Sequence, residues 1–142
     1  MNISILPGHK GPDAVFTNER IANFLYKHLE EFGDPKEDIL ACLDYVHHKG
    51  GFVTVGTVQD EIAGVVVINE TGMRRYIPEN ILVYIAVDGK FRGKGYGKEL
   101  MRAALDQAEG HVALHVEPHN PARHLYEKLG FTNKYLEMRY EK

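Results

Sequence analysis

The sequence has few of the features that mark secreted, membrane or disulfide-held proteins. Its single cysteine, Cys42, has no partner for an internal disulfide. No apolar stretch approaches the roughly 20 residues that a membrane-spanning helix needs. The N-terminal residues MNISILPGHK also lack a charged segment followed by a long apolar one. We therefore expect a cytoplasmic protein that has no membrane partner.

An excess of positive charge is also missing. The chain has 17 basic and 20 acidic residues, which gives a formal net charge of −3. This balance argues against a general polyanion surface, so we expect no nucleic-acid partner. Against this background, the basic cluster between Lys90 and Arg102 stands out as a candidate site. The whole chain of 142 residues suits one domain spanning 1–142, and there are no repeats or low-complexity tracts.

Hydrophobic periodicity predicts alternating strands and helices. In chain order we expect a strand at 2–6, a helix at 21–32, a helix from an Asp34 N-cap to about Gly50, a hairpin of 52–58 with 61–69, a strand ending at Val87, a helix carrying Leu100 to Ala108, a strand at 112–117, a helix at 121–129 and a final strand from Phe131. His28 lies on the apolar face of its helix, where we expect a packed residue rather than a ligand. His47 and His48 are adjacent, and neighbours on a helix diverge by about 100°, so we expect no metal site.

The stretch Val83 to Met101 organises the chain as strand, glycine-rich turn and helix. Gly93, Gly95 and Gly97 have no Cβ, so backbone N–H groups could converge on an anion where the positive end of the helix dipole lies. The spacing fits neither the P-loop nor the dinucleotide pattern G-x-G-x-x-G. A glycine-rich basic surface turn is the alternative interpretation.

The arrangement Arg92-x-x-Gly95-x-Gly97 resembles the acyl-CoA pyrophosphate loop of the GNAT N-acetyltransferase superfamily. The segment Asn120 to Phe131 is similar to that family's second motif, N-x-A-x-x-L-Y-E-K-x-G-F, although Asn120 stands six residues before Tyr126 where many relatives have seven. The resemblance implies an α/β (α+β) GNAT fold: a central mixed, mostly antiparallel twisted sheet of six to seven strands flanked by about four helices.

By this resemblance, acetyl-CoA or CoA is the cosubstrate. The backbone near Val87 would pair with its pantetheine arm, the amides from Arg92 to Lys98 would hold its pyrophosphate, and Asn120 would bond near the thiol end. The implied cofactor-binding residues are Ile85, Ala86, Val87, Arg92, Gly93, Lys94, Gly95, Tyr96, Gly97, Lys98, Asn120 and Arg123.

The resemblance also implies catalytic residues. Tyr126 matches a tyrosine that commonly donates a proton to the departing thiolate, and a phenol is neutral at pH 7; a core tyrosine is the alternative. Many relatives carry a glutamate where this chain has Val83, so the base must lie elsewhere. Histidine titrates near neutral pH, and we rank His115 first and Glu117 second, with a structural role for His115 as the alternative.

The expected function is transfer of an acetyl group to a primary amine in a ternary complex, with a small molecule or a peptide or protein as acceptor. The main alternative is a non-catalytic acyl-CoA-binding module of the same fold. A nucleic-acid binder is disfavoured by the net charge. The sequence leaves the acceptor open, and also leaves open whether the chain forms a homodimer.

Overall fold

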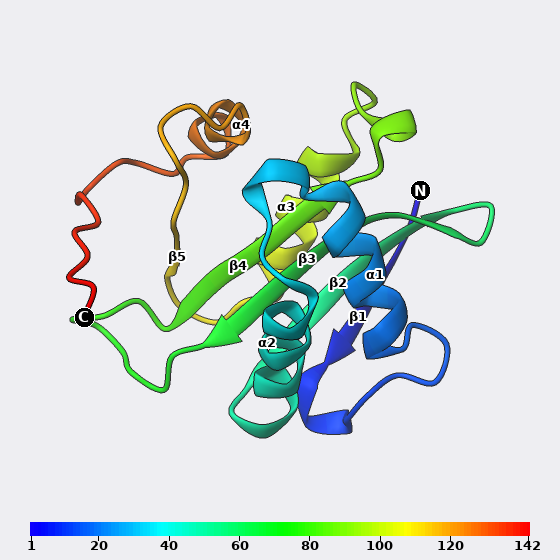
Figure 1. Ribbon diagram of the computed structural model, residues 1–142, viewed down its shortest axis with the longest axis horizontal. Helices are drawn as coiled ribbons and strands as arrows, with labels where there is room; N and C mark the ends of the chain where they lie inside the picture. The colour runs from blue at the N-terminus through cyan, green and yellow to red at the C-terminus, as the bar shows by residue number, and fades with distance from the viewer.

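The computed structural model describes residues 1–142 as one five-stranded sheet with helices on both faces (Figure 1). In chain order its elements are β1 (Asn2–Pro7), the 3₁₀ turn η1 (Gly8–Lys10), α1 (Asn18–His28), η2 (Glu30–Phe32), α2 (Lys36–His48), β2 (Gly51–Val58), β3 (Glu61–Glu70), β4 (Asn80–Val87), η3 (Gly89–Phe91), α3 (Tyr96–Gln107), β5 (Val112–Leu114) and α4 (Ala122–Lys128). No helix combines the length and apolar character that crossing a membrane requires.

The sheet is mixed and mostly antiparallel, as expected. The strand order is β1-β2-β3-β4-β5, and only the β4–β5 pair is parallel. The central strand is β3, whose residues Val65 to Ile68 are fully buried, because apolar side chains on both faces need a cover on each side. The expected hairpin is confirmed: Gln59 and Asp60 both have positive φ, at 51° and 65°, as a two-residue turn between twisted strands requires.

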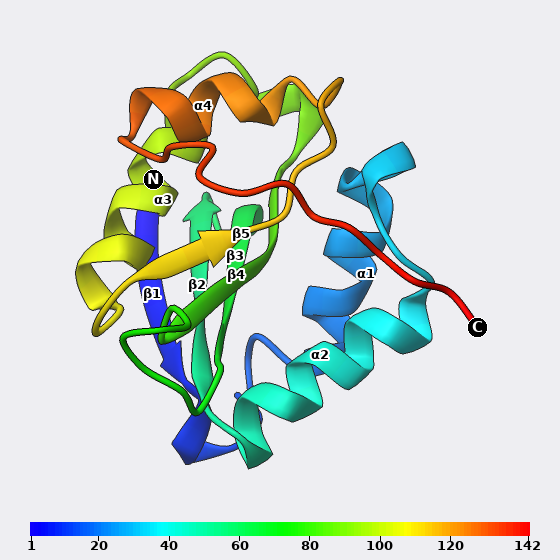
Figure 2. The same ribbon diagram turned by 90° about the vertical axis from the view of Figure 1, so that its left-hand side faces the viewer.

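Two apolar layers fill the space on either side of the sheet. Figure 2 shows α1 and α2 on one face and α3 on the other, with α4 above it. Ile21, Leu25 and Ile39 belong to the cluster on the first face. Leu100, Met101 and Tyr126 belong to the cluster on the second. The helices therefore use the apolar stripes that their sequences predicted.

The prediction of six to seven strands is wrong, because the sheet has five. The strand expected at 112–117 is reduced to β5, and the final strand expected from Phe131 does not form. Leu136, Met138 and Tyr140 alternate along the chain but are 83%, 89% and 89% exposed. Alternation produces a strand only where a neighbour offers backbone partners, and β5, with only three residues, offers few.

Two helix ends also differ from the prediction. The first helix stops at His28 and not at Phe32, because Glu30 adopts a positive φ of 56° and a 3₁₀ turn follows. Asp34 does not cap the second helix: Pro35 occupies the N-cap position, and no side chain bonds there. The freed Asp34 side chain turns toward the sheet instead.

Candidate active site

β5 pairs with only the first part of β4. Asn80, Ile81 and Leu82 pair with Val112, Ala113 and Leu114, and there the ladder ends. Figure 1 shows the chain after β5 running away from β4 towards α4. The edge of β4 from Val83 to Val87 thus keeps backbone groups that no neighbouring strand satisfies on that side. Such groups need another partner, and an extended ligand arm could supply it.

A bulge in β4 lies at the start of this open edge. In the pairing with β3, Val67 faces Tyr84 and Ile68 faces Leu82, so Val83 is the extra residue. The bulge changes which face the side chains point to. Leu82 packs in the cluster beside α3, whereas Tyr84 packs in the cluster beside α1 and α2. The position where many relatives carry a carboxylate is therefore the bulge itself, and it holds an apolar valine.

A cavity of about 300 Å³ lies between the unpaired part of β4 and the chain that follows β5. Its lining comes from the end of α1, the 29–34 connection, β4, the glycine loop and the start of α4. The lining residues are His28, Leu29, Phe32, Asp34, Val83, Tyr84, Ile85, Arg92, His115, Asn120, Pro121, Ala122 and Tyr126. The structure thus brings Ile85, Arg92, His115, Asn120 and Tyr126 together from the predicted site residues.

The glycine loop has the backbone shape that an anion site needs. Gly93 and Gly95 have φ of 79° and 81°, and a Cβ at either would meet nothing within 4 Å. Gly95 is the N-cap of α3, and no side chain bonds to this helix end. The first N–H groups of the helix are therefore free for an anion. Gly97 differs, because a Cβ there would touch Leu125 and Val87 at 3.5 and 3.6 Å.

Two of the basic side chains at this loop already have partners within the chain. Arg92 donates to the carbonyl oxygens of Val87 and His28, at 3.2 and 3.1 Å, and lies 3.4 Å from a Glu30 carboxylate oxygen. Lys90 pairs with Glu61 at 3.1 Å. The Arg92 side chain therefore ties the loop to the end of α1, and Lys94 and Lys98 are left as the cations for a ligand.

Tyr126 is a buried phenol with an uncommitted hydroxyl. The residue is 7% exposed, and its ring packs against Phe131 with centroids 5.9 Å apart. Burial raises the pKa of Tyr126 to about 12. No protein atom accepts a hydrogen bond from its hydroxyl. The phenol is therefore protonated at neutral pH and can donate to a ligand in the cavity.

The two base candidates lie in different places. His115 lines the cavity, whereas the Glu117 carboxylate is exposed and lies 3.5 Å from His119 Nε2. A strand continuing to residue 117, as predicted, would have put both side chains on one face, but the strand stops at Leu114. Asn120 uses its Oδ1 to accept from the N–H of Ala122 at 2.9 Å, which leaves its amide NH₂ group free.

Of the other predicted residues, Ala86 is buried on the α1 and α2 face, and Val87 offers its carbonyl to Arg92. Tyr96 begins α3, with its ring 6.1 Å from that of Phe91. Arg123 pairs with Glu127 on the outside of α4 at 3.4 Å.

Sequence reasoning missed three polar residues of the cavity wall. His28 lies 3.6 Å from an Asp88 carboxylate oxygen, and burial lowers its pKa although the Asp88 charge opposes this. The Asp34 carboxylate accepts a hydrogen bond from the Tyr84 hydroxyl at 2.6 Å. A phenol within the apolar run of β4 was the available signal, because a buried hydroxyl needs a partner.

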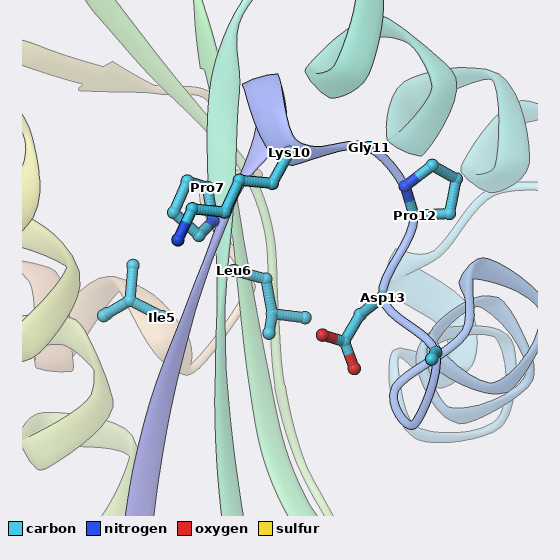
Figure 3. Close-up of a pocket in the computed structure, with 8 residues that line it drawn as sticks. Ile5, Leu6, Pro7, Lys10, Gly11, Pro12 and Asp13 are labelled. Carbon is cyan, nitrogen blue, oxygen red and sulfur yellow. The ribbon is translucent and has the colours of Figure 1, made fainter.

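A second hollow, of about 230 Å³, lies beside the end of β1 (Figure 3). Figure 3 shows Lys10 folded back over Pro7 and the Asp13 carboxylate turned toward Leu6. This carboxylate already accepts from the N–H groups of Val15 and Phe16, at 3.0 and 2.8 Å. Its polar groups thus stabilise a turn, and the cavity at β4 and β5 is the better candidate.

Comparison with known proteins identifies the family of the chain. The family model described as the acetyltransferase (GNAT) family matches residues 16–131. The chain therefore belongs to the GNAT acetyltransferase family. No curated protein matches the chain.

Solved structures of low sequence identity share the fold. One is aminoglycoside N-acetyltransferase AAC(6')-Iy in complex with CoA, with a TM-score of 0.73 and 17% identity over 99% of this chain and 95% of that one. Another is ribosomal-protein-alanine N-acetyltransferase from Brucella melitensis biovar Abortus 2308, with a TM-score of 0.69 and 19% identity over 100% of both chains. At such identities the likeness concerns the fold alone.

Proposed function

We propose that this chain is an N-acetyltransferase that moves an acetyl group from acetyl-CoA directly to a primary amine, with both substrates bound at once. One observation carries the proposal: the uncommitted hydroxyl of Tyr126 belongs to a cavity that opens at the unpaired edge of β4. A donor arm along that edge and an amine in the cavity would meet at this hydroxyl. The proposal treats residues 1–142 as a single domain.

The chain's own groups fit acetyl-CoA. The glycine turn leaves room where a Cβ would stand, and the unpaired N–H groups of α3 suit a pyrophosphate. Lys94 and Lys98 add positive charge. Arg92 would contribute its backbone, because its guanidinium is already bonded to the end of α1. The free NH₂ group of Asn120 could donate near the thiol end.

Bound acetyl-CoA would supply a thioester. The amine nitrogen would attack its carbonyl carbon, and the carbon–sulfur bond would break as the new carbon–nitrogen bond forms. Tyr126 would donate its proton to the sulfur that leaves. An amine reacts only as the neutral base, so a group must take the proton that the nitrogen loses. We assign this role to His115, directly or through one water. Glu117 ranks second, since it would first have to leave its position beside His119.

The test is CoA thiol release from acetyl-CoA with a panel of amines. Two proteins of similar fold are an aminoglycoside N-acetyltransferase and a ribosomal-protein-alanine N-acetyltransferase, so the panel includes an aminoglycoside and a peptide that begins with alanine. A diamine and a free amino acid complete the panel. We expect at least one amine to raise thiol release well above the rate without acceptor. Tight CoA binding without turnover of any amine would instead favour an acyl-CoA-binding module.

A further inference from the structure

The connection between α1 and α2 forms the wall of the cavity that faces the start of α4. Phe32 and Asp34 come from this connection, and Asn120 and Tyr126 come from the segment that leads into α4 and from α4 itself. Asp34 directly precedes Pro35, where a carboxylate would ordinarily bond to the N-terminal amides of the helix. Here it bonds to none of them. The Asp34 side chain therefore lines the cavity and does not cap the helix.

Tyr84 holds the Asp34 carboxylate in this orientation. The phenol lies just after the bulge in β4, is 7% exposed, and donates to Asp34 Oδ2 at 2.6 Å. Burial and the neighbouring carboxylate both raise the pKa of Tyr84, so it stays a donor. One carboxylate oxygen is thereby fixed, and no protein group donates to the other.

No cation of the chain neutralises Asp34. Lys36, two residues along, pairs with Glu19 across α1. Arg92, the cationic side chain that lines the cavity, is bonded to two carbonyl groups and lies against Glu30. Asp34 is exposed to solvent where it lines the cavity. A carboxylate that is oriented by a neutral donor, unpaired by the protein and accessible from the cavity suits a positively charged ligand group.

We propose that Asp34 binds a second, positively charged amino group of the acceptor, so that the enzyme prefers diamines over monoamines. This inference rests on the proposed function, because it names the acceptor class for the same cavity. The two amino groups have different requirements: the one near Tyr126 must be neutral to react, whereas the one at Asp34 binds best as an ammonium ion. Asp34 is thus a specificity residue and takes no proton from the reacting nitrogen.

The experiment compares two amines of equal chain length, 1,4-diaminobutane and 1-aminobutane, with shorter and longer diamines to cover the unknown span. At saturating acetyl-CoA we expect the best diamine to exceed 1-aminobutane in kcat/KM by about tenfold or more, mainly through KM, which is the scale of one charge-assisted hydrogen bond. Asp34→Asn keeps an oxygen that can accept from Tyr84 but removes the charge. It should abolish the preference, because kcat/KM should fall much more for the diamine than for 1-aminobutane.

Controls separate a lost charge from a damaged fold. Glu37→Gln removes a carboxylate from the same acidic segment outside the cavity lining, and should keep the diamine preference. Tyr84→Phe keeps the Asp34 charge but releases its orientation, so the preference should shrink without vanishing. Should Asp34→Asn fail to bind CoA, the Tyr84→Phe variant decides, and an unchanged preference there overturns the proposal.

A binding measurement makes the inference independent of turnover. With CoA present, the diamine should raise the melting temperature of the wild-type protein, and this shift should disappear in Asp34→Asn. Equal kcat/KM for diamine and monoamine, absence of the shift in the wild type, or an equal loss for both amines in Asp34→Asn would each overturn it. CoA binding without turnover of any amine would overturn the proposed function instead, and the melting shift would still decide whether Asp34 binds diamines.

Discussion

At the scale of single residues, Tyr84 and Tyr126 place two phenols in one cavity, and they differ in what their hydroxyls bond. Tyr84 donates to Asp34, whereas Tyr126 has no partner in the protein. Only the Tyr126 hydroxyl is free to donate a proton to the sulfur as negative charge develops there. The proposed general acid is therefore distinguished by its missing hydrogen bond as much as by its position in a motif.

We predict that Tyr126→Phe lowers kcat by about 10²-fold, the usual scale of a general acid. The ring keeps its packing on Phe131, so CoA affinity and the melting temperature should change little. The measurement is single-turnover thiol release, with calorimetric CoA binding as the control. Wild-type rates in this variant, with the chemical step shown to limit turnover, would remove Tyr126 from the mechanism.

The base is the second prediction at this scale. If His115 takes the amine proton, His115→Gln should lower kcat/KM and remove the acidic limb of its pH profile, while Glu117→Gln should change little because Glu117 lies outside the cavity. Two acceptors with different ammonium pKa values are needed. A limb that follows the acceptor and survives both substitutions would mean that the enzyme captures the neutral amine without a base of its own.

Side-chain direction is what residue-level sequence reasoning could not supply. Asp34-Pro35 has the composition of a helix start, yet the Asp34 carboxylate accepts a hydrogen bond from the Tyr84 hydroxyl of β4 and does not cap the helix. Arg92 matches the motif as a phosphate ligand, yet two carbonyl groups and Glu30 occupy its guanidinium. Tyr84 is 50 residues from Asp34, and two of the three Arg92 partners, His28 and Glu30, are 64 and 62 residues from it. Local spacing does not reveal partners this far away in sequence.

At the scale of elements, the glycine loop and the start of α3 act together as one anion site. Gly95→Asp should weaken CoA binding strongly, because it puts a carboxylate into open space beside the unpaired N–H groups, at a positive φ that disfavours a side chain. Calorimetric CoA titration measures the effect. Gly97→Asp should also weaken binding, because it adds an anion at the start of the helix; its Cβ would make only ordinary contact with Leu125 and Val87.

Gly89→Asp is the matched control for this loop. Gly89 also has open space around its Cβ position, but its φ is not positive and it lies at the far end of the turn. It should retain most of the CoA affinity. Unchanged affinity in folded Gly95→Asp and Gly97→Asp proteins would show that the pyrophosphate binds elsewhere.

Elements were predictable from sequence where the local pattern and the neighbours agreed. The hairpin at Gln59-Asp60 and the buried strand β3 carry their own signals, in turn chemistry and in apolar length. The bulge at Val83 carries none, because it depends on the register with β3. The segment after Phe131 has the alternation of a strand without an edge to pair with, and this is why the strand count was too high.

At the scale of the whole molecule, a basic segment and an acidic segment both contribute residues near the cavity. The glycine loop and the start of α3 carry Lys94 and Lys98, whereas residues 30–38, from η2 into the first turn of α2, carry Glu30, Glu31, Asp34, Glu37 and Asp38. The first segment suits a polyanionic donor, and the second suits a cationic acceptor. The net charge of −3 alone does not show this local grouping of charge.

His28 lies where α1, β4 and the glycine loop meet, so its titration is linked to the stability of the whole fold. Its side chain is 13% exposed, packs on Phe24 with ring centroids 4.5 Å apart, and faces Asp88. Burial lowers its pKa below the ordinary 6.5; the charges of Lys27 and Arg92 also lower it, and those of Asp88 and Glu30 oppose the change. The folded protein thus favours the neutral imidazole.

The sign of the resulting pH dependence follows from proton linkage. As the pH falls through 6.5, the unfolded chain binds a proton at His28 that the folded chain still refuses. The stabilisation is therefore complete above pH 6.5 and is lost on acidification. We predict that His28→Gln flattens the fall of the free energy of unfolding between about pH 7 and pH 5, by at most about 1.4 kcal/mol per pH unit for one proton.

Urea unfolding at several pH values measures this slope, and differences between variants cancel the other seven histidines of the eight. His48→Gln is the matched control, because His48 has the same chemistry at a helix end but a side chain that is 70% exposed. Its slope should equal that of the wild type. Equal slopes for His28→Gln and the wild type would mean that Asp88 offsets the burial of His28 completely, and the contact between α1 and the glycine loop would then not depend on pH through this residue.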